Sequence, residues 1–299
     1  MNMKNSYICM TATLVVLAGT AVPAMAGFTS ITTCNPTVAA PAGSLISASG
    51  DYAVNANLTS ASGDCILITV RNVSLKLNGF TITGPNGAGV GVDVLPPSGR
   101  VDHVAIQGPG SIQGFTNGIT INNADYSQVG QVAATHNLSS GIRGDSDTFL
   151  TVSSNVLDGN GVWGLLLTNL TSGTISYNEA SGNGGSTSPA AAGGIRITGA
   201  ANTVNNNVAS GNGAQAVSGA SFNSGITISA NSSRVYSNVT NGNLGPGIQV
   251  SSGSTGNLMF NNSSSIGNGT FDLEDDNATC TTDFWSSDVF ITRNATCVQ

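Results

Sequence analysis

The sequence has 299 residues with 8 Lys and Arg against 15 Asp and Glu, which gives a formal net charge of -7 at pH 7. A protein that neutralises many phosphates needs a dense set of cations, so this balance argues against nucleic acid as a partner. Charged residues make up 8% of the chain and hydrophobic residues 39%. The Ile, Val and Leu residues recur in register, which excludes a low-complexity disordered chain.

The first 26 residues have the pattern of an export signal. Lys4 supplies a positive start, residues 13–18 are a short apolar stretch, and Ala24-Met25-Ala26 fits the small-x-small rule for cleavage. The apolar stretch is too short to span a bilayer, and no second one follows. We therefore expect cleavage after Ala26 and a secreted or periplasmic protein without membrane insertion.

One short pattern returns along the chain. An apolar residue is followed three positions later by Asn, then by a second Asn five further on, and then by Gly-Ile-x-Ile or a close variant. The glycines of this pattern are Gly118, Gly141, Gly164, Gly194, Gly225 and Gly247, with an earlier turn at Gly91 and Thr270 in the last position. A repeat of about this period predicts a solenoid whose turns stack on one another.

Apolar residues fall into columns when the turns are aligned on these glycines. Residues two apart point to one face of a strand, so stacked turns would bury each column together. The column after the glycine is Ile119, Ile142, Leu165, Ile195, Ile226, Ile248 and Phe271; the next is Ile121, Gly144, Leu167, Ile197, Ile228, Val250 and Leu273; an upstream column is Ile106, Val129, Val152, Ile175, Val204, Val235 and Met259. This spacing predicts three short strands in each turn.

The repeated Asn residues stand between the expected strands. Asn tolerates left-handed backbone geometry, and its amide can bond to the turns above and below. We therefore expect Asn ladders at the corners of the solenoid and assign none of these residues to catalysis.

A solenoid has two open ends, and each needs a cap. We expect a signal peptide over residues 1–26, an N-terminal cap and first strands over 27–80, β-helix repeats over 81–273 and a C-terminal cap over 274–299. Phe284 and Trp285 are available in that last segment to close the core.

Four cysteines remain once Cys9 leaves with the signal, and four cysteines allow three connectivities. Because the repeat region separates them into two pairs, we expect Cys34–Cys65 and Cys280–Cys297, one disulfide in each cap. Structural disulfides agree with an oxidising compartment.

Through Asn-x4-Asn and Gly-Ile-x-Ile, residues 65–273 resemble the right-handed parallel β-helix repeat family, the pectate-lyase-like superfamily. The resemblance implies an all-β fold, a single-stranded right-handed parallel β-helix with disulfide-stapled caps. The family includes polysaccharide lyases, glycoside hydrolases, epimerases and adhesins, so the fold implies no single reaction. Of the family's catalytic motifs, only Gly194-Ile195-Arg196-Ile197 is similar to an Arg-Ile-Lys segment, with Thr198 where Lys would stand.

The residue between the two buried positions of each Gly-Ile-x-Ile faces outward, and this surface holds the candidate site. Arg143 and Arg196 lie two turns apart on it, about 10 Å by the strand spacing. Asp145 and Asp147 follow Arg143. An Arg near paired carboxylates can hold a sugar acid, while a carboxylate can abstract a proton. Arg143, Asp145, Asp147 and Arg196 are therefore candidate catalytic residues.

Two further features border this surface. An exposed aromatic ring can stack on a sugar, so Trp163 is a candidate substrate-binding residue together with His136; a Trp packed under a loop is the alternative. Residues 184–193 and 213–224 are insertions in consecutive turns. We expect them to wall a shallow groove, with neutral loop elongation as the alternative.

An acid-rich run near the C-terminus holds Asp272, Glu274, Asp275 and Asp276. Oxygen ligands at close spacing suit Ca²⁺, and a solvated acidic edge is the alternative. The sequence requires no cofactor, and two distant histidines argue against a zinc site.

These observations predict an exported, monomeric protein that binds or processes a polysaccharide or cell-surface glycan. No catalytic motif is complete, so the sequence leaves open whether the protein is an enzyme; the family implies a polysaccharide lyase or glycoside hydrolase if it is. A non-catalytic structural or adhesive surface protein is the alternative.

Overall fold

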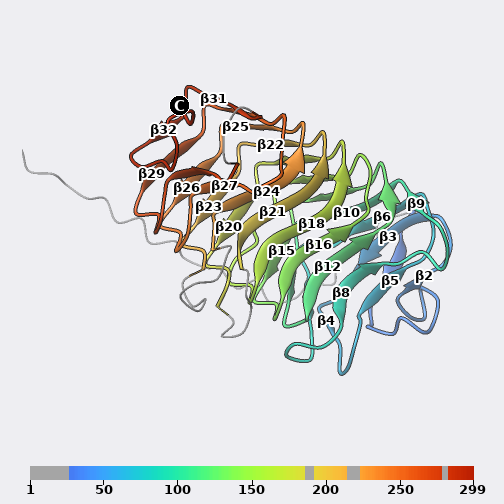
Figure 1. Ribbon diagram of the computed structural model, residues 1–299. Helices are drawn as coiled ribbons and strands as arrows, with labels where there is room; N and C mark the ends of the chain where they lie inside the picture. Colours follow the sequence, from blue (N-terminus) through green and yellow to red (C-terminus); the bar gives the residue numbers. More distant parts are fainter. Residues whose placement is uncertain (1–26, 186–191, 214–222, 278–281) are drawn as a thin grey trace, which may run out of the picture.

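The computed structural model describes residues 27–185, 192–213, 223–277 and 282–299 (Figure 1). In these residues the regular structure is β-strand. Figure 1 shows successive turns of the chain stacked from the blue N-terminal end to the red C-terminal end of one rod. No helix in the described residues has the length and apolar character needed to cross a membrane.

One side of the rod is a ten-stranded sheet built from the Gly-Ile-x-Ile segments. In spatial order its strands are β2 (Leu45–Ile46), β5 (Ile66–Ile68), β8 (Val90–Val94), β12 (Asn117–Asn122), β16 (Ser140–Asp145), β18 (Trp163–Thr171), β21 (Gly193–Ala200), β24 (Ile226–Asn231), β27 (Ile248–Val250) and β30 (Leu273–Asp275). Each pairs in parallel with the strand one turn away, as expected for a solenoid.

The second side is an eleven-stranded parallel sheet. Its strands are β1 (Thr29–Ile31), β3 (Gly50–Val54), β6 (Val73–Lys76), β10 (Val104–Gln107), β14 (Gln128–Gly130), β17 (Thr151–Ser153), β19 (Thr174–Ser176), β22 (Thr203–Asn205), β25 (Arg234–Tyr236), β28 (Leu258–Phe260) and β31 (Phe284–Ser286). Residues 27–80 thus supply strands to the same stack as the later repeats.

The third side consists of two shorter sheets. The first holds β4 (Leu58–Thr59), β7 (Thr81–Thr83), β11 (Ser111–Gln113) and β15 (Ala133–Thr135); the second holds β20 (Glu179–Ser181), β23 (Val208–Ser210), β26 (Val239–Asn241), β29 (Ser263–Ile266) and β32 (Val289–Phe290). Single bridges through Val156 join them. At one corner β9 (Val101–Asp102) pairs with β13 (Ala124–Asp125).

The predicted apolar columns form the core. Ile106 through Met259 pair in register along the eleven-stranded sheet, and Trp285 extends this column by one turn. Their side chains are buried, as are Ile119 through Ile248 on the ten-stranded sheet. The predicted three strands per turn are confirmed.

The register of the last turn differs from the prediction. Ile248 pairs with Leu273 and Val250 with Asp275, so Leu273 rather than Phe271 ends the first column. Glu274 therefore takes the outward position expected for Asp272. The cause is that the last turn has lost its marker glycine, and Asp272 instead stacks beside Gly247.

The predicted Asn ladders are confirmed at two corners. One runs through Asn137, Asn160, Asn183, Asn212, Asn243 and Asn268, and the other through Asn155, Asn178, Asn207, Asn238 and Asn262. Each inner amide group accepts from the turn before it and donates to the turn after it. The second ladder ends in Asp288, whose Oδ1 accepts hydrogen bonds from the backbone N–H and the Nδ2 of Asn262 at 2.7 and 2.9 Å.

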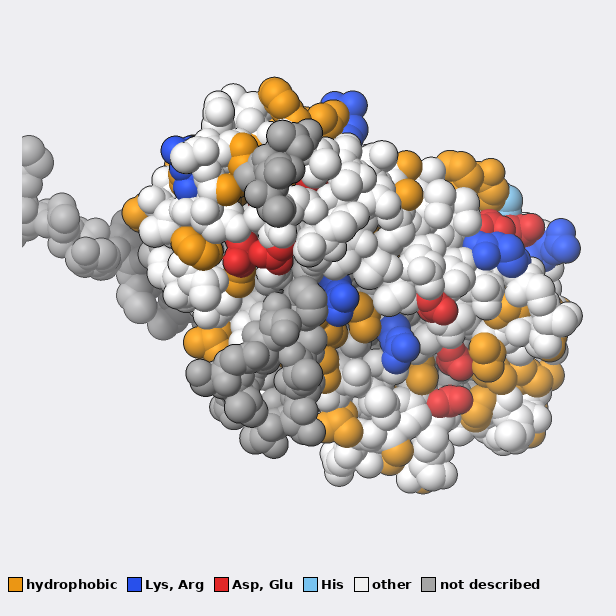
Figure 2. Space-filling model, viewed as in Figure 1, with side chains coloured by type: hydrophobic (Ala, Val, Ile, Leu, Met, Phe, Trp, Pro, Cys, Tyr) orange, Lys and Arg blue, Asp and Glu red, His pale blue; other side chains and the backbone are white. Residues whose placement is uncertain are grey.

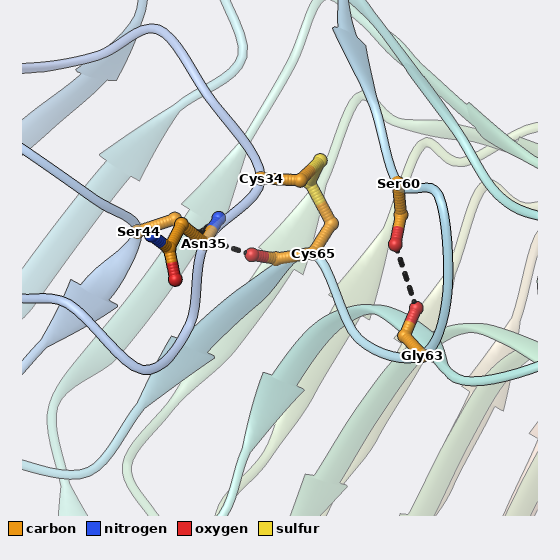
Figure 3. Close-up of a disulfide and its surroundings, with 6 residues drawn as sticks. All are labelled: Cys34, Asn35, Ser44, Ser60, Gly63 and Cys65. Carbon is orange, nitrogen blue, oxygen red and sulfur yellow. Dashed lines mark hydrogen bonds between the residues drawn. A yellow bond between two sulfur atoms is a disulfide. The ribbon is translucent and has the colours of Figure 1, made fainter.

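The Cys34–Cys65 disulfide is present near the N-terminal end, with the two Cα atoms 4.4 Å apart (Figure 3). Beside it, the Ser44 hydroxyl donates to the carbonyl oxygen of Cys65. Cys280 lies outside the described residues, so its pairing with Cys297 stays a prediction. At the opposite end of the rod, Val298 is buried against the core.

Candidate functional site

The outward positions of the ten-stranded sheet form one row along the rod, which we call the outer row. In register it holds Leu67, Asp93, Thr120, Arg143, Leu166, Arg196, Thr227, Gln249 and Glu274. Neighbouring members are one strand spacing apart, about 4.8 Å. Figure 2 shows this face of the molecule, with basic side chains near its centre and acidic side chains to both sides.

Two arginines stand at the centre of the outer row. Arg143 on β16 is exposed, and Arg196 on β21 is half-buried. Leu166 lies between them, so the two positions are two strand spacings apart, about 10 Å. The guanidinium carbon of Arg196 lies 6.0 Å from the centre of the Trp163 ring. Partial burial lowers the pKa of Arg196, and the ring beneath it holds its side chain against the sheet.

Trp163 is covered in this structure and retains only 3% of its exposure. The chain at Gly193 lies against the ring, where an added Cβ would be 2.6 Å from a ring carbon. The ring is therefore not open to stacking by a sugar. Its contact with Arg196 makes it a support for the outer row.

His136 lies away from the outer row, at the corner that leads from the third side into the ten-stranded sheet. It lines a cleft of about 520 Å³ together with Leu138, Asn86 and several glycines. Burial raises the pKa of the adjacent Asp158, and the hydrogen bond that its Oδ1 accepts from the Ser181 N–H at 3.0 Å partly opposes this rise. The structure does not bring His136 together with Arg143.

Asp145 and Asp147 point in different directions. Asp145 accepts hydrogen bonds from Thr168 Oγ1 at 2.6 Å and Asn169 Nδ2 at 3.1 Å on the outside of the rod. Asp147 points into the core and is 1% exposed. Its Oδ1 accepts the Ala124 N–H at 2.8 Å, whereas Oδ2 is buried with no hydrogen-bond partner among the described residues. Burial raises the pKa of Asp147 to about 7.

Sequence reasoning missed a carboxyl group near the N-terminal end of the outer row. Asp93 is nearly buried, and burial together with the nearby charge of Asp64 raises its pKa to about 6. Asp64 itself accepts the Val90 N–H at 2.8 Å. The only sequence signal for Asp93 was its place in the outward column, two strands from Arg143.

A pair of carboxyl groups occupies the C-terminal end of the row. Burial, followed by the charge and hydrogen bond of Asp276, raises the pKa of Glu274 to about 7. Asp276 accepts a hydrogen bond from Gln249 Nε2 at 2.9 Å, and the Oε1 of Gln249 accepts one from Ser224 Oγ at 3.0 Å. The pair therefore holds one proton between two carboxyl groups near neutral pH.

The four acidic residues considered for Ca²⁺ are not gathered around one point. Asp272 accepts the N–H groups of Ile291 and Thr292 at 2.9 and 2.8 Å, and Asp275 accepts the Trp285 indole N–H at 3.1 Å. Across the described ranges, no group of three or more His, Cys, Asp or Glu side chains could hold a metal ion. Residues 186–191 and 214–222, which make up most of the two insertions, lie outside the described residues.

No protein-family model matches the sequence, and no curated protein matches it. Among solved structures, the chain is similar to the Dettilon tailspike protein, with 14% identity and a TM-score of 0.53 over 82% of this chain and 52% of the tailspike. The chain has the right-handed parallel β-helix fold. This confirms the predicted fold class.

Two further structures are similar to this β-helix with lower TM-scores. An alginate lyase from Paenibacillus is 14% identical, with a TM-score of 0.49 over 90% of this chain and 99% of that one. The A-module of a mannuronan C-5 epimerase from Azotobacter vinelandii is 15% identical, with a TM-score of 0.41 over 84% and 87%. At these identities the likeness concerns the fold alone.

The β-helix thus presents three chemical groups in one line. Asp93 stands at one end, Arg143 and Arg196 in the middle, and the Glu274–Asp276 pair at the other end. Arginine can pair with a carboxylate through two parallel hydrogen bonds, and a carboxyl group that keeps its proton near neutral pH can act as a general acid.

Proposed function

We propose that the outer row binds an acidic polysaccharide lying along the rod. The observation that carries this proposal is the placement of Arg143 and Arg196 on one face, two strands apart. An extended polymer with a carboxylate on its sugar units can meet both guanidinium groups at once. Trp163 stabilises the second contact by supporting Arg196.

Protonation of the acidic residues in the row makes binding of this acidic partner more favourable below neutral pH. An anionic polymer would be repelled by ionised Asp93 and Glu274, but their raised pKa values of about 6 and about 7 keep both groups largely protonated in mild acid. A guanidinium group ordinarily titrates far above this pH interval. Affinity for an acidic glycan therefore falls as the pH rises through this interval.

We also propose that the Glu274–Asp276 pair supplies the proton in glycan processing. Glu274 is the member that holds a proton near pH 7, and Asp276 is the neighbouring carboxylate that keeps it there. A carboxyl group whose pKa is raised by burial and by a neighbouring like charge can serve as the general acid in chemistry on sugars. Glu274 lies three strands from Arg196 along the same row.

The Cys34–Cys65 disulfide supports the proposal that the protein works outside the cytoplasm. Disulfides persist in secreted and periplasmic proteins and are rare in reducing compartments. Fractionation of the producing cells, with an antibody against the protein, tests this point directly.

Isothermal titration with a defined oligouronate tests the binding site. We expect Arg143→Ala and Arg196→Gln each to weaken binding about ten-fold or more, because each loses a charge-assisted pair. Arg234→Ala is the matched control, since Arg234 is an exposed arginine on the eleven-stranded sheet. Equal affinity in all four proteins would refute the outer row as the site.

A further inference from the structure

The eleven-stranded sheet has a hollow on its outer face. Gly130 stands in an outward column between Gln107 and Ser153, with which it pairs on β10 and β17. The missing side chain opens a space of about 240 Å³ that is also lined by Gln128, Gln131 and Ser154. None of these residues is charged, and three of them are exposed amide or hydroxyl side chains.

A stack of aromatic rings stands at the corner just before this hollow. The rings of His103 and Tyr126 are 5.6 Å apart, and those of Tyr126 and Phe149 are 4.7 Å apart at an interplanar angle of 10°. Tyr126 is 57% exposed and Phe149 is 44% exposed. Each ring lies two residues before the first outward-facing residue of its strand, which is Ala105, Gln128 or Thr151. The stack and the hollow therefore lie on the same part of the surface.

Hydrogen bonds to the residues that precede two of the rings hold the stack in place. The guanidinium group of Arg100 donates to Asp125 at 2.6 and 2.8 Å and to Thr148 Oγ1 at 3.1 Å. Asp125 and Thr148 directly precede Tyr126 and Phe149 in the chain. The hydrogen bond from Arg100 holds the pKa of Asp125 below its ordinary value, so this clamp persists in mild acid. The two exposed rings are therefore pre-ordered before any ligand arrives.

The stack also has an open end. The corner position that follows Phe149 in the next turn is Ser172, which has the same left-handed backbone (φ 54° and 55°) but no ring. The face of the Phe149 ring that is directed towards the next turn is thus not covered by a fourth aromatic residue. Aromatic faces of this kind accept the apolar face of a sugar ring.

We propose that the Gly130 hollow and the His103–Tyr126–Phe149 stack form a second glycan-binding site, which takes an uncharged sugar chain. Three amide groups and two hydroxyls offer donors and acceptors to sugar hydroxyls, and no ionised side chain lines the hollow to favour an acidic sugar. Tyr126 and Gly130 are four residues apart, at most about 13 Å along the strand. One short oligosaccharide can reach both features.

This site is separate from the outer row, since it lies on a different sheet and uses different chemistry. Its test is titration with neutral oligosaccharides of glucose, galactose and xylose. We expect at least one of them to bind. Gly130→Gln should weaken that binding about ten-fold or more, because the new side chain fills the hollow. Gly130 has no left-handed backbone, and an added Cβ would meet only Ser153 O at 3.3 Å and its Oγ at 3.6 Å, so this variant is expected to fold.

Tyr126→Ser removes a ring and keeps a residue that the same corner uses at Ser172. We expect it to weaken neutral-sugar binding about three- to ten-fold. Tyr236→Ser is the matched control, because Tyr236 stacks on Phe260 at 4.8 Å on the same sheet, far along the rod. Arg143→Ala is expected to leave neutral-sugar binding intact.

Three results would overturn the site. They are a wild-type protein that binds none of the neutral oligosaccharides, unchanged binding in both Gly130→Gln and Tyr126→Ser, and an equal loss in Tyr236→Ser or Arg143→Ala. Because the outer row is tested with an oligouronate and this site with neutral oligosaccharides, the failure of one proposal does not decide the other.

Discussion

The Oδ2 atom of Asp147 occupies the space that a side chain on Gly144 would fill, since a Cβ there would lie 2.6 Å from this oxygen. Gly144 is the one glycine in a column of Ile, Leu and Val, and the carboxyl group of the next corner enters the gap. The core of the rod thus contains a titratable group.

Asp147 makes the stability of the protein depend on pH. Its pKa rises from about 3.9 in an unfolded chain to about 7 in the fold, mainly through burial. The folded state therefore holds the proton more tightly, so the stabilisation is complete below about pH 4 and is lost as the pH rises towards 7. The difference corresponds to about 4 kcal/mol. We expect Asp147→Asn to flatten the pH dependence of the free energy of unfolding, measured by urea titration at pH 4, 5.5 and 7.5.

Other buried carboxyl groups add to the slope of the wild-type protein, so the difference between the two curves is the informative quantity. Parallel curves for wild type and Asp147→Asn would contradict the assignment.

Asn207→Ala is expected to destabilise the fold by about 3 kcal/mol or more, because it leaves several buried polar groups without partners. Asn207 accepts from the backbone and side chain of Asn178 and donates to Ile175 and Asn238, all at 3.0 Å. Chemical denaturation measures the loss. Asn205→Ala, at a half-buried outward position of β22, is the control and should stay within about 0.5 kcal/mol of wild type.

Ile226 tests the apolar column itself. Its side chain is fully buried between Ile195 and Ile248. Ile226→Val should cost about 1 kcal/mol, whereas Ile226→Asp places an unpaired charge in the core and should cost about 4 kcal/mol or more. The melting temperatures of both variants measure these losses. An aspartate variant as stable as the valine variant would show that the column is wrongly placed.

Cleavage of a polysaccharide, if Glu274 is the proton donor, should decline as the pH rises through about 7. Glu274→Gln should abolish new reducing or unsaturated ends and keep binding. Asp276→Asn removes the neighbouring charge, lowers the pKa of Glu274, and should move the alkaline limb of the profile to lower pH. An unmoved limb in Asp276→Asn would exclude Glu274 as the titrating group.

The sequence was sufficient for the columns and the ladders because every turn repeats the same physical requirement. A stacked strand must bury the residues flanking its outward position, and a corner amide must pair with the turns on either side. Where Thr270 replaces the repeated glycine in the last turn, the predicted register was wrong by two residues, because Leu273 rather than Phe271 pairs with Ile248.

The candidate site was harder to read because corners interrupt the alternation of a strand. Arg143, Asp145 and Asp147 are two apart and would share a face in an extended strand. Ser146 adopts a left-handed backbone with φ of 59°, and the chain turns there, so Asp147 points inward. The Glu274–Asp276 pair was missed as a proton-sharing site for a related reason, since its position depended on the register of the last turn.

The carboxyl group that closes the second Asn ladder ends the run of amides inside the protein. Each inner Asn passes an N–H forward to the following turn, but Asp288 has no amide to give. Its Oδ2 atom is buried without a hydrogen-bond partner among the described residues, so the ladder presents no open hydrogen-bonding group at this position. The same side chain thus satisfies Asn262 and terminates the repeat.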